Sequence, residues 1–497
     1  MPVSRRDFLQ KTTIASAAVG LSAISTARAA DTNDIRVAVI GVNGRGNSHI
    51  SGMRNNVVAI CDVDRMVLEA KAKQFEEHAA TQAEEGKTAA RDKVDTEVDF
   101  RRLLERDDID AVSIATPNHT HSYIAIEAAQ AGKDVYVEKP VSHNVWEGRQ
   151  LANAARKYGR VIQCGTQARS GKAVRDAVEF VHGGGMGSVR YVVGTCYKPR
   201  QSIGKLDQPL RIADHIDYDL WCGPAEKREL FRPRLHYDWH WDLNTGNGDT
   251  GNQGIHQMDI SRWFLGEDSI APRVMSIGGR LGYDDAGDTP NSHIVYHDYD
   301  KAPLIFETRG LPRSKADQED WGGSMDMYRG SGVGVIVQCE NGYVRCTNYS
   351  NVQAYNNDGE LIQSFEGGGD HMSNWLEAVA ARDPGMLNAE VLEGHLSSAL
   401  CHTGLIAHRL GSQAPAGEIA ERVAHNDLLA HSFDRMASHL RANGVDVDSV
   451  DEDGNAALTA SGWLEFDPEA EKCTSDDNAN QFVSREYRAP YVVPEIA

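Results

Sequence analysis

The chain has 497 residues and a formal net charge of −21, with 41% hydrophobic and 25% charged residues. This composition excludes a disordered chain, and the excess of acidic residues argues against a nucleic-acid-binding protein and against docking on an anionic membrane. At roughly 150 residues per domain, the length predicts two to three domains with ample material for buried cores.

Residues 1–29 have the features of an export signal. Arg5 and Arg6 precede a weakly apolar run, which ends in a small-x-small cleavage pattern at residues 27–29. The run is too short and too rich in Ala, Ser and Thr to span a bilayer. The segment resembles a twin-arginine signal, with a Sec signal as the alternative. We therefore expect recognition by the twin-arginine translocase, a periplasmic or otherwise exported protein, and a cofactor inserted before export.

Residues 35–158 alternate short β-branched runs with amphipathic helical stretches. Apolar runs typical of buried parallel strands are Ile35–Ile40, Val57–Cys61, Ala111–Ala115 and Asp134–Val137, and helices are predicted at Arg65–Glu77 and Ser122–Ala131. This repetition predicts an α/β fold with a doubly wound parallel sheet, the Rossmann fold. The polar stretch Thr81–Thr96 is interpreted as a surface insertion.

Residues 159–411 carry longer alternating runs, which predict an α/β domain with a large, mainly antiparallel open sheet. The runs are Val189–Tyr197, Val274–Gly279, Ile294–Tyr299, Leu304–Thr308, Val333–Cys339 and Tyr343–Thr347, with helices predicted at His371–Arg382 and Asn388–Leu410. Residues 412–497 are expected to form a C-terminal extension, with a helix over Ala420–Ala442 and a proline-punctuated end that wraps around the protein.

The eight cysteines have no metal-like spacing. Cys339 and Cys346 flank a predicted two-residue turn at residues 341–342, in which Cys339 faces Val344. Because Cys346 is then only a diagonal neighbour, we expect no disulfide between them.

A glycine-rich turn, G-V-N-G-R-G, follows the first predicted strand at residues 41–46. Gly41, Gly44 and Gly46 permit a tight turn and a close approach of backbone N–H groups to a pyrophosphate. The next strand ends at Asp62, about 20 residues further on, where a carboxylate takes ribose hydroxyls. Asp62 would repel a 2′-phosphate, which favours NAD over NADP. The alternative is a glycine turn beside an unrelated aspartate.

Two further motifs follow later strands of this domain. A-T-P-N-H-T-H covers residues 115–121, and E-K-P covers residues 138–140. Ligands in such sheets bind beyond the carboxyl ends of the strands, so both motifs are expected at the cofactor crevice. Turn and helix-cap chemistry is the alternative for Asn118, His119 and His121.

In this order and spacing, G-V-N-G-R-G, A-T-P-N-H-T-H and V-E-K-P resemble the glucose–fructose oxidoreductase / inositol dehydrogenase / rhizopine-catabolism (Gfo/Idh/MocA) family over about residues 35–411. The resemblance implies a Rossmann domain that binds NAD and an α/β domain whose open sheet makes homo-oligomer contacts. It also implies that Lys139 reaches the substrate hydroxyl and the nicotinamide ribose, before a cis bond to Pro140. The implied cofactor-binding residues are Gly41, Asn43, Gly44, Arg45, Gly46, Asp62, Thr116, Pro117, Asn118, His119, Glu138 and Lys139.

The second domain contains a candidate catalytic histidine. The family pattern has an Asp four residues before this histidine, and here Asn252 stands four residues before His256. The nearest acid upstream is Asp249, and Asp259 could orient the imidazole from the same helical face. We expect His256 to act as acid or base, with Lys139, Asn252 and Asp249 as further catalytic candidates. A helix-capping histidine is the alternative.

Residues 236–242 read H-Y-D-W-H-W-D. Trp239 and Trp241 suit the apolar face of a sugar ring, with core packing as the alternative for one of them. A metal site at the two histidines is disfavoured, because the Glu of H-E-x-x-H is absent and the stretch is not helical. Gln167, Arg169 and Asp259 are expected to complete a carbohydrate site.

The sequence thus predicts an exported NAD-dependent oxidoreductase that acts on a sugar, glycoside or cyclitol hydroxyl. Because little free NAD exists outside the cytoplasm, we expect a tightly held cofactor that is recycled within the site. The alternative is a redox-neutral NAD-dependent glycosidase or lyase, although G-N-Q-G-I-H at residues 251–256 lacks the Tyr-Pro-Thr-His run of the family's α-N-acetylgalactosaminidase branch. A ligand-sensing dinucleotide-binding protein is a third class, and the presence of Lys139 and His256 argues against it.

Overall fold

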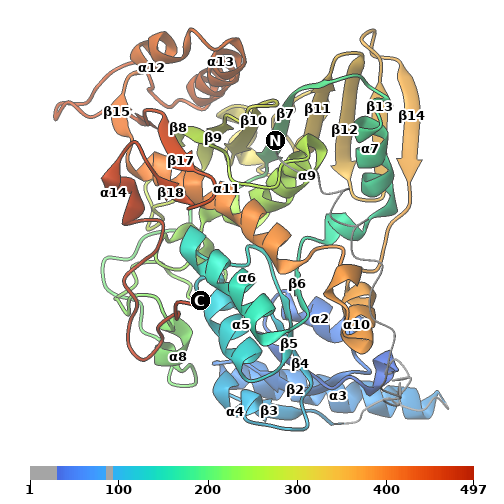
Figure 1. Ribbon diagram of the computed structural model, residues 1–497. Helices are drawn as coiled ribbons and strands as arrows, with labels where there is room; N and C mark the ends of the chain where they lie inside the picture. Colours follow the sequence, from blue (N-terminus) through green and yellow to red (C-terminus); the bar gives the residue numbers. More distant parts are fainter. Residues whose placement is uncertain (1–30, 86–92) are drawn as a thin grey trace.

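The computed structural model describes residues 31–85 and 93–497, so the expected export signal lies outside the described residues. Two sheets, each covered by helices, lie one above the other (Figure 1). Helix α11 (Val391–Arg409) joins them, because it packs against α6 (Val145–Tyr158) below and α9 (Ile255–Leu265) above.

The first sheet has six parallel strands in the order β3-β2-β1-β4-β5-β6, the order of a Rossmann fold. Its strands are β1 Val37–Ile40, β2 Val57–Cys61, β3 Asp95–Glu97, β4 Ala111–Ile114, β5 Asp134–Val137 and β6 Ile162–Cys164. Strands β1, β4, β5 and β6 are buried along their whole length, which explains their continuous apolar sequence. The predicted parallel sheet is confirmed, and it continues through β6, beyond residue 158.

Helices α2 Gly46–Gly52, α3 Arg65–Glu84, α4 Phe100–Leu104, α5 His121–Gln130 and α6 lie between these strands. Side-chain caps determine where helices begin. The Asp64 side chain accepts hydrogen bonds from the first backbone N–H groups of α3, and the Asn144 side chain accepts one from the backbone N–H of Glu147 in α6. Gly159 ends α6 in the left-handed conformation, with φ of 59°.

The interpretation of Thr81–Thr96 as a surface insertion is wrong at both ends. Helix α3 continues to Glu84, and residues 95–97 form the edge strand β3, paired with β2. Residues 86–92 lie outside the described part of the chain. Strand β3 is polar because an edge strand has only one neighbour and is largely exposed.

The second sheet has twelve strands and is antiparallel except for the parallel pair β7 and β10. Its strands are β7 Val189–Tyr197, β8 Arg273–Gly279, β9 Ser292–His297, β10 Leu304–Arg309, β11 Val333–Cys339, β12 Gly342–Asn348, β13 Asn351–Tyr355, β14 Leu361–Glu366, β15 Ser412–Ala414, β16 Leu458–Ala460, β17 Leu464–Asp467 and β18 Lys472–Cys473. The large, mainly antiparallel sheet is confirmed, and the six predicted runs correspond to β7 through β12.

The β11–β12 hairpin has a different register from the predicted one. Cys339 faces Gly342, and Cys346 faces Val335, so the turn residues are 340 and 341. All eight cysteines are buried and unpaired.

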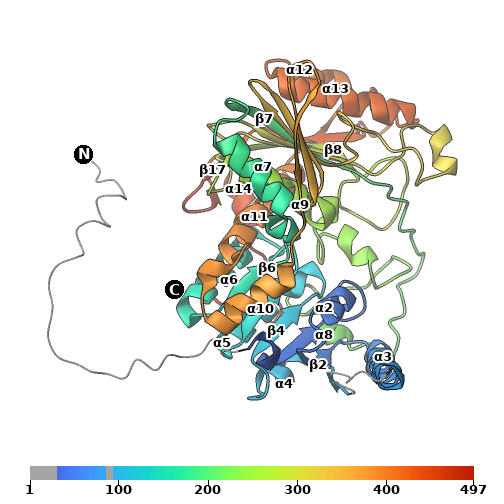
Figure 2. The ribbon, with the colours of Figure 1, turned by 90° about the vertical axis from the view of Figure 1, so that its right-hand side faces the viewer.

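Helices cover both faces of the second sheet (Figure 2). Helices α7 (Lys172–His182), α9 and α11 pack on one face, and α12 (Ala416–Val423) and α13 (Asp427–Ala442) pack on the other, over β8, β9 and β10. The single helix predicted over Ala420–Ala442 is wrong, because Asn426 caps a new helix at this point. The extension therefore covers part of the face that we expected to be open for contacts between copies of the chain.

The C-terminal part of the chain returns to the first domain. Helix α10 (His371–Ala381) places Trp375 in the core beside β1, and Tyr491, Val493 and Ile496 are buried with side chains of α5 and α6. Figure 1 shows the chain after α14 (Asp477–Asn480) running past α8 (Tyr218–Cys222) to its end beside α5 and α6. The end therefore wraps around the protein, as predicted.

Short segments complete the structure: 3-10 turns η1 Thr32–Asp34, η2 Asn118–Thr120, η3 Gln167–Ser170, η4 Asp238–Trp241, η6 Ala316–Glu319 and η7 Pro384–Met386, and the π-helical turn η5 Thr250–Gly254. Within residues 31–85 and 93–497, no helix has the length and apolar character needed to cross a membrane.

Candidate active site

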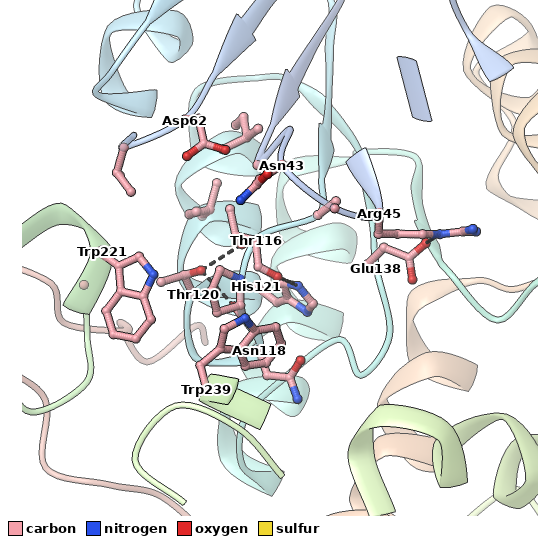
Figure 3. A pocket seen from close by; sticks show the side chains of 18 of the residues that line it. Asn43, Arg45, Asp62, Thr116, Asn118, Thr120, His121, Glu138, Trp221 and Trp239 are labelled. Carbon is pink, nitrogen blue, oxygen red and sulfur yellow. Dashed lines mark hydrogen bonds and ion pairs between the residues drawn. The ribbon is translucent and has the colours of Figure 1, made fainter. Parts of the chain in front are cut away.

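A cavity of about 520 Å³ lies at the carboxyl ends of the strands of the first sheet. One wall comes from the segments that follow β1, β2, β4 and β5, and the opposite wall comes from residues 220–223 and 236–240, between β7 and α9. Figure 3 shows side chains of both walls facing the same space. This is the ligand crevice of a doubly wound sheet, and the volume suits a cofactor or small-molecule site.

The glycine-rich turn leaves space where a pyrophosphate is expected. A Cβ at Gly41, whose φ is 84°, would lie 2.8 Å from backbone atoms of Ala115 and Thr116. A Cβ at Gly46 would lie 2.0 Å from the carbonyl oxygen of Gly41. Gly44 lines the cavity, and a Cβ at this position would have no neighbour within 4 Å. The first and last glycines are therefore needed for backbone packing, and the middle one allows close approach of a ligand.

Asp62 lines the cavity at the end of β2, as expected for a ribose-binding carboxylate. Its Oδ2 accepts a hydrogen bond from the backbone N–H of Val42 (2.9 Å), and its Oδ1 from that of Asp64 (3.1 Å). Burial raises the pKa of Asp62, and these two donors partly offset the rise. A carboxylate has about four acceptor positions, so Asp62 keeps capacity for ribose hydroxyls.

The segment after β4 also lies at the cavity, where Thr116, Pro117 and Asn118 line it. The hydroxyl of Thr120 donates to Oγ1 of Thr116 (2.8 Å), which fixes the turn. Asn118 Nδ2 donates to Oδ1 of Asn247 (3.1 Å), so this side chain links the two domains.

His119 does not reach the cavity, which corrects its assignment to the cofactor. Its ring nitrogens contact the carbonyl oxygens of Trp221 (2.9 Å) and Thr245 (3.2 Å), and burial lowers its pKa to about 4. His121 lines the cavity instead, with its ring nitrogens 2.7 Å from the carbonyl oxygens of Pro140 and Thr116. Both histidines therefore hold backbone segments in place.

Glu138, at the end of β5, is the centre of a buried polar cluster. Its Oε1 accepts from Arg45 Nε at 2.7 Å and from Gln167 Nε2 at 3.2 Å. Figure 3 shows the Arg45 and Glu138 side chains next to each other. Burial alone would raise its pKa, but His49 together with the charges of Arg45 and Lys139 holds the pKa well below its usual range. Gln167 supports Glu138 and does not line the cavity, contrary to the expected substrate contact. Arg45 lines the cavity, as does Asn43 in the same turn.

Lys139 lies at the junction of the two domains, next to a cis peptide bond to Pro140. Its Nζ donates a hydrogen bond to the backbone carbonyl oxygen of Asn252 at 2.5 Å. Asn252 lies in the π-helical turn η5, and such widened turns are frequent at functional sites. Both residues line the cavity. Burial lowers the pKa of Lys139, against the charge of Glu138, which raises it.

His256 follows η5 in the first turn of α9 and is only 9% exposed. Its Nδ1 is buried and has no hydrogen-bond partner within the described residues. Burial and then the charge of Lys139 lower its pKa to about 3, so the ring is neutral at neutral pH. A neutral imidazole can accept a proton from a ligand, and His256 lies behind the cavity lining, one helical turn after Asn252.

The acids expected beside His256 have other partners, which corrects their assigned roles. Asp249 forms a two-pronged ion pair with Arg200, with distances of 2.6 and 2.7 Å. Asp259 accepts from Arg169 Nε (2.9 Å) and from the hydroxyl of Ser397 (2.7 Å). These pairs are buried and lie outside the cavity lining, so Asp249, Asp259 and Arg169 support the scaffold.

The two tryptophans of residues 236–242 have different environments. Trp239 lines the cavity and stacks on His240, with ring centroids 3.6 Å apart. Trp241 is 4% exposed and packs against Arg200, outside the cavity lining. Trp239 therefore keeps its expected place, and Trp241 is a core residue.

The carboxylates of this segment are also paired within the protein. Asp242 binds Arg228 and Arg232, and Asp238 binds Arg234. Across residues 31–85 and 93–497, no group of three or more metal-ligating side chains is found.

Residues 220–223 are a part of the cavity that the sequence analysis missed. These residues belong to the long segment between β7 and α9. Asp64 of the first domain holds this segment in place through contacts with His215 Nδ1 (2.8 Å) and His236 Nε2 (3.2 Å). Trp221 and Trp239 then face the strand ends across the cavity (Figure 3). We call residues 198–249 the clasp. The pattern D-Y-D-L-W-C-G-P at residues 217–224 predicts a capped short helix. The pattern does not predict that this helix packs against the first domain.

Comparisons with known proteins follow the same two-domain division. The oxidoreductase family model with an NAD-binding Rossmann fold matches residues 35–166, and the model of that family's C-terminal alpha/beta domain matches residues 189–330. The chain belongs to the Gfo/Idh/MocA oxidoreductase family. The first match ends just after β6 and the second begins with β7, so this Gfo/Idh/MocA chain has an NAD-binding first domain.

The chain resembles sugar-related Gfo/Idh/MocA proteins. It is 23% identical over 269 residues to levoglucosan dehydrogenase of Pseudarthrobacter phenanthrenivorans, covering 54% of this chain and 58% of that protein. It is 35% identical over 286 residues to glycosyl hydrolase family 109 protein 1 of Shewanella sp. strain MR-4, covering 49% of this chain and 60% of that protein. The matches thus span less than two thirds of either relative.

A solved structure shares the fold. The WlbA dehydrogenase from Bordetella pertussis, in complex with NADH and UDP-GlcNAcA, superposes with a TM-score of 0.53 at 17% identity, covering 76% of this chain and 96% of that chain. In the present chain, the open space over Gly44 and the carboxylate of Asp62 fit the pyrophosphate and adenosine ribose of NAD.

Proposed function

We propose that the protein is an exported NAD-dependent oxidoreductase that acts on a hydroxyl group of a sugar, glycoside or cyclitol. The observation that carries the proposal is the contact between Lys139 of the first domain and Asn252 of the second, at the wall of the cofactor cavity. His256, a largely buried and neutral imidazole, follows Asn252 by one helical turn. Trp239 offers a flat apolar surface that suits a sugar ring.

Two residues have separate roles in the proposed reaction, one as the proton acceptor and the other as a cation. NAD, when bound, supplies the acceptor for the hydride that leaves the substrate carbon with both electrons of the C–H bond. Neutral His256 takes the hydroxyl proton, and the oxygen forms the carbonyl bond. The ammonium group of Lys139 stabilises negative charge on that oxygen, an effect typically of about 3–4 kcal/mol. Glu138 accepts from the backbone N–H of Lys139 at 3.2 Å and so holds its main chain in place.

We also propose that the cofactor stays bound and is recycled by a second carbohydrate. The clasp supports this proposal, because Leu220, Trp221 and Trp239 form a wall opposite the nucleotide-binding turns. From the C-terminal end, Tyr491 also lines the cavity, and its hydroxyl donates to Asp219 of the clasp at 3.0 Å. Release of a bound dinucleotide then requires the clasp to open.

A second candidate function is a redox-neutral glycosidase or lyase that oxidises a sugar transiently. It is supported by the 35% identity to a glycosyl hydrolase family 109 protein. The same proton acceptor and cation would serve this reaction, in which the hydride returns to the sugar.

The test is the absorbance of reduced nicotinamide in the purified protein with a panel of sugars, glycosides and cyclitols. Appearance of the band with one compound and its loss with a second supports recycling. Cleavage of a glycoside without a net increase in reduced-nicotinamide absorbance supports the glycosidase. If no compound reduces the cofactor and no glycoside is cleaved, the proposed function is wrong.

Export is tested with the precursor. We expect replacement of both Arg5 and Arg6 by lysine to retain the protein in the cytoplasm, whereas Lys11→Arg leaves export unchanged. Normal export of the double variant would show that another pathway is used.

A further inference from the structure

A second cavity, of about 750 Å³, lies between the clasp, the C-terminal half of α11 and residues 481–488. The two cavities share no lining residue. They are connected by a side-chain hydrogen bond, because Asn247 lines the second cavity and bonds to Asn118 of the first. Figure 1 shows the chain after α14 running along this side of the molecule. The volume is within the range of small-molecule sites.

Four arginines line this cavity, and two of them have no carboxylate partner in the described part of the chain. Arg485 donates to the backbone oxygen (2.9 Å) and to Oδ1 (2.7 Å) of Asn244. Arg409, the last residue of α11, lies over the ring of Phe482 at 3.7 Å and makes no hydrogen bond or ion pair with a described residue. Arg228 is paired with Asp242 at 2.5 Å.

These guanidinium groups repel one another. Burial lowers the pKa of Arg409, and the charge of Arg485 lowers it further, while Asp288 raises it. Burial also lowers the pKa of Arg485, with an opposing effect of Glu147 and a further lowering by Arg228. Arginine stays charged under all ordinary conditions, so both groups carry a positive charge at this cavity. The nearby charges of Asp288 and Glu147 offset part of the cost of burial without forming an ion pair with either arginine in the described residues.

The other charged groups around the cavity form no ion pair with Arg409 or Arg485 among the described residues. Lys227 and Arg488 are both bound to Asp219. Asp288 accepts a hydrogen bond from the backbone N–H of Leu243 (2.7 Å) and is not within ion-pair distance of either unpaired arginine. Glu226 and Glu486 are exposed residues of the lining, with no ion pair among the described residues. Five cationic side chains and three carboxylates line the cavity, in a protein whose net charge is −21.

Neutral polar groups line the same cavity. His402 is 3% exposed, and its buried Nδ1 has no partner among the described residues. Asn144 and Tyr487 are further donors and acceptors of the lining. Such groups suit the hydroxyls of a polyol, while guanidinium groups suit a planar or tetrahedral oxyanion.

We propose that this cavity binds a small polyhydroxylated oxyanion, a sugar acid or a sugar phosphate, through Arg409 and Arg485. The site is separate from the cofactor cavity and does not depend on the proposed reaction. Its lining includes Asn247, so a bound ligand affects the domain junction through the hydrogen bond between Asn247 and Asn118.

The experiment is calorimetric titration of the full-length protein with NAD bound, using D-glucuronate, inorganic phosphate and neutral D-glucose as probes. We expect one of the two anions to bind with a 1:1 ratio, and the tighter one identifies the oxyanion as carboxylate or phosphate. Arg409→Gln and Arg485→Gln should each weaken this binding about 10- to 100-fold, the usual effect of losing a charge-assisted hydrogen bond. D-glucose should show no binding that depends on these arginines.

The matched control is Arg102→Gln, which should leave the affinity unchanged. Arg102 is an exposed residue of α4 whose side chain has no partner in the described residues. NAD binding reports on folding, and it should persist in all three variants because the cavities share no lining residue. If Arg485→Gln does not fold, Arg409→Gln decides alone, since its guanidinium makes no hydrogen bond in the described structure. Absence of binding by both anions, or binding that Arg409→Gln leaves unchanged, overturns the proposal.

Discussion

The side-chain nitrogen of Lys139 lies 2.5 Å from the backbone carbonyl oxygen of Asn252, and this contact joins the two domains at the cofactor cavity. Because the acceptor is a main-chain atom, the contact does not require a particular side chain at position 252. The Asn252 side chain makes no hydrogen bond within the described residues and lines the cavity. It is therefore available to a ligand, while its backbone positions the lysine.

Lys139 should determine the alkaline limit of activity. Burial lowers its pKa, so the ammonium form is lost as pH rises through a value below the ordinary lysine pKa of about 10.4. If the ammonium group stabilises the substrate oxygen, kcat/KM falls over that range. Lys139→Arg keeps the charge at all accessible pH values and should lose this alkaline limb, at some cost in turnover. Identical alkaline limbs in both proteins would contradict the assignment.

Asn252→Asp should move the alkaline limb to higher pH. A new carboxylate beside Lys139 favours the protonated amine, and an opposite charge at this range shifts a pKa by about 1 unit or more. The measurement is the pH profile of kcat/KM. Asn357→Asp, in the exposed turn between β13 and β14, is the matched control with the same change of charge. An unshifted profile in Asn252→Asp would mean that the side chain at this position points away from Lys139.

Features that depend on local sequence were predictable, and those that depend on distant partners were not. Strands β1, β4 and β5 were predicted because each is buried throughout and so is continuously apolar. The exposed edge strand β3 was missed because its sequence is polar. The glycine turn was predicted because backbone packing at Gly41 and Gly46 excludes a Cβ. Asp249 and Asp259 were misassigned because their arginine partners lie 49 and 90 residues away. Residues 220–223 were missed for the same reason, since the contacts that hold the clasp to Asp64 span 151 and 172 residues.

His256 should be required for turnover and not for cofactor binding. Removal of a positioned proton acceptor typically lowers the rate about 10²- to 10⁴-fold, and His256→Ala should lower kcat by this amount. NAD affinity should persist, because His256 lies outside the cavity lining.

The acid side of the pH profile gives a second test of His256. Its pKa is lowered to about 3, so the neutral ring is lost only as pH falls through this value. The wild-type protein should therefore show no acid limb from His256 between about pH 5 and 7. An acid limb near the ordinary histidine pKa that disappears in His256→Gln would show that the imidazole is more solvated than the structure indicates, and full activity in His256→Ala would exclude the catalytic role.

Trp221 should slow the release of the cofactor. It belongs to the clasp, and its carbonyl oxygen is held by His119 while its ring faces the cavity (Figure 3). Trp221→Ala removes a large part of that wall, and we expect NAD to dissociate about 10-fold faster, in line with the loss of apolar contact area. The measurement is stopped-flow displacement of NADH. Trp463→Ala, which packs against Tyr296 outside the cavity, should leave the rate unchanged. Equal rates in both variants would argue against retention by the clasp.

Asp62 should determine both the affinity for NAD and the discrimination against NADP. Its carboxylate lies at the end of β2, lines the cavity and keeps free acceptor positions beside its bonds to Val42 and Asp64. Asp62→Ala removes charge-assisted hydrogen bonds to the ribose, so the Kd for NAD should rise about 10- to 100-fold. The same change removes a negative charge that repels a 2′-phosphate, so NADP should lose less affinity than NAD, or gain some. The two dissociation constants are measured by calorimetry, with the exposed Asp107→Ala as a control for loss of one negative charge. The ratio of the constants is the decisive quantity, because a general disturbance of the turn weakens both cofactors equally. An unchanged ratio in Asp62→Ala would show that this carboxylate does not bind the ribose.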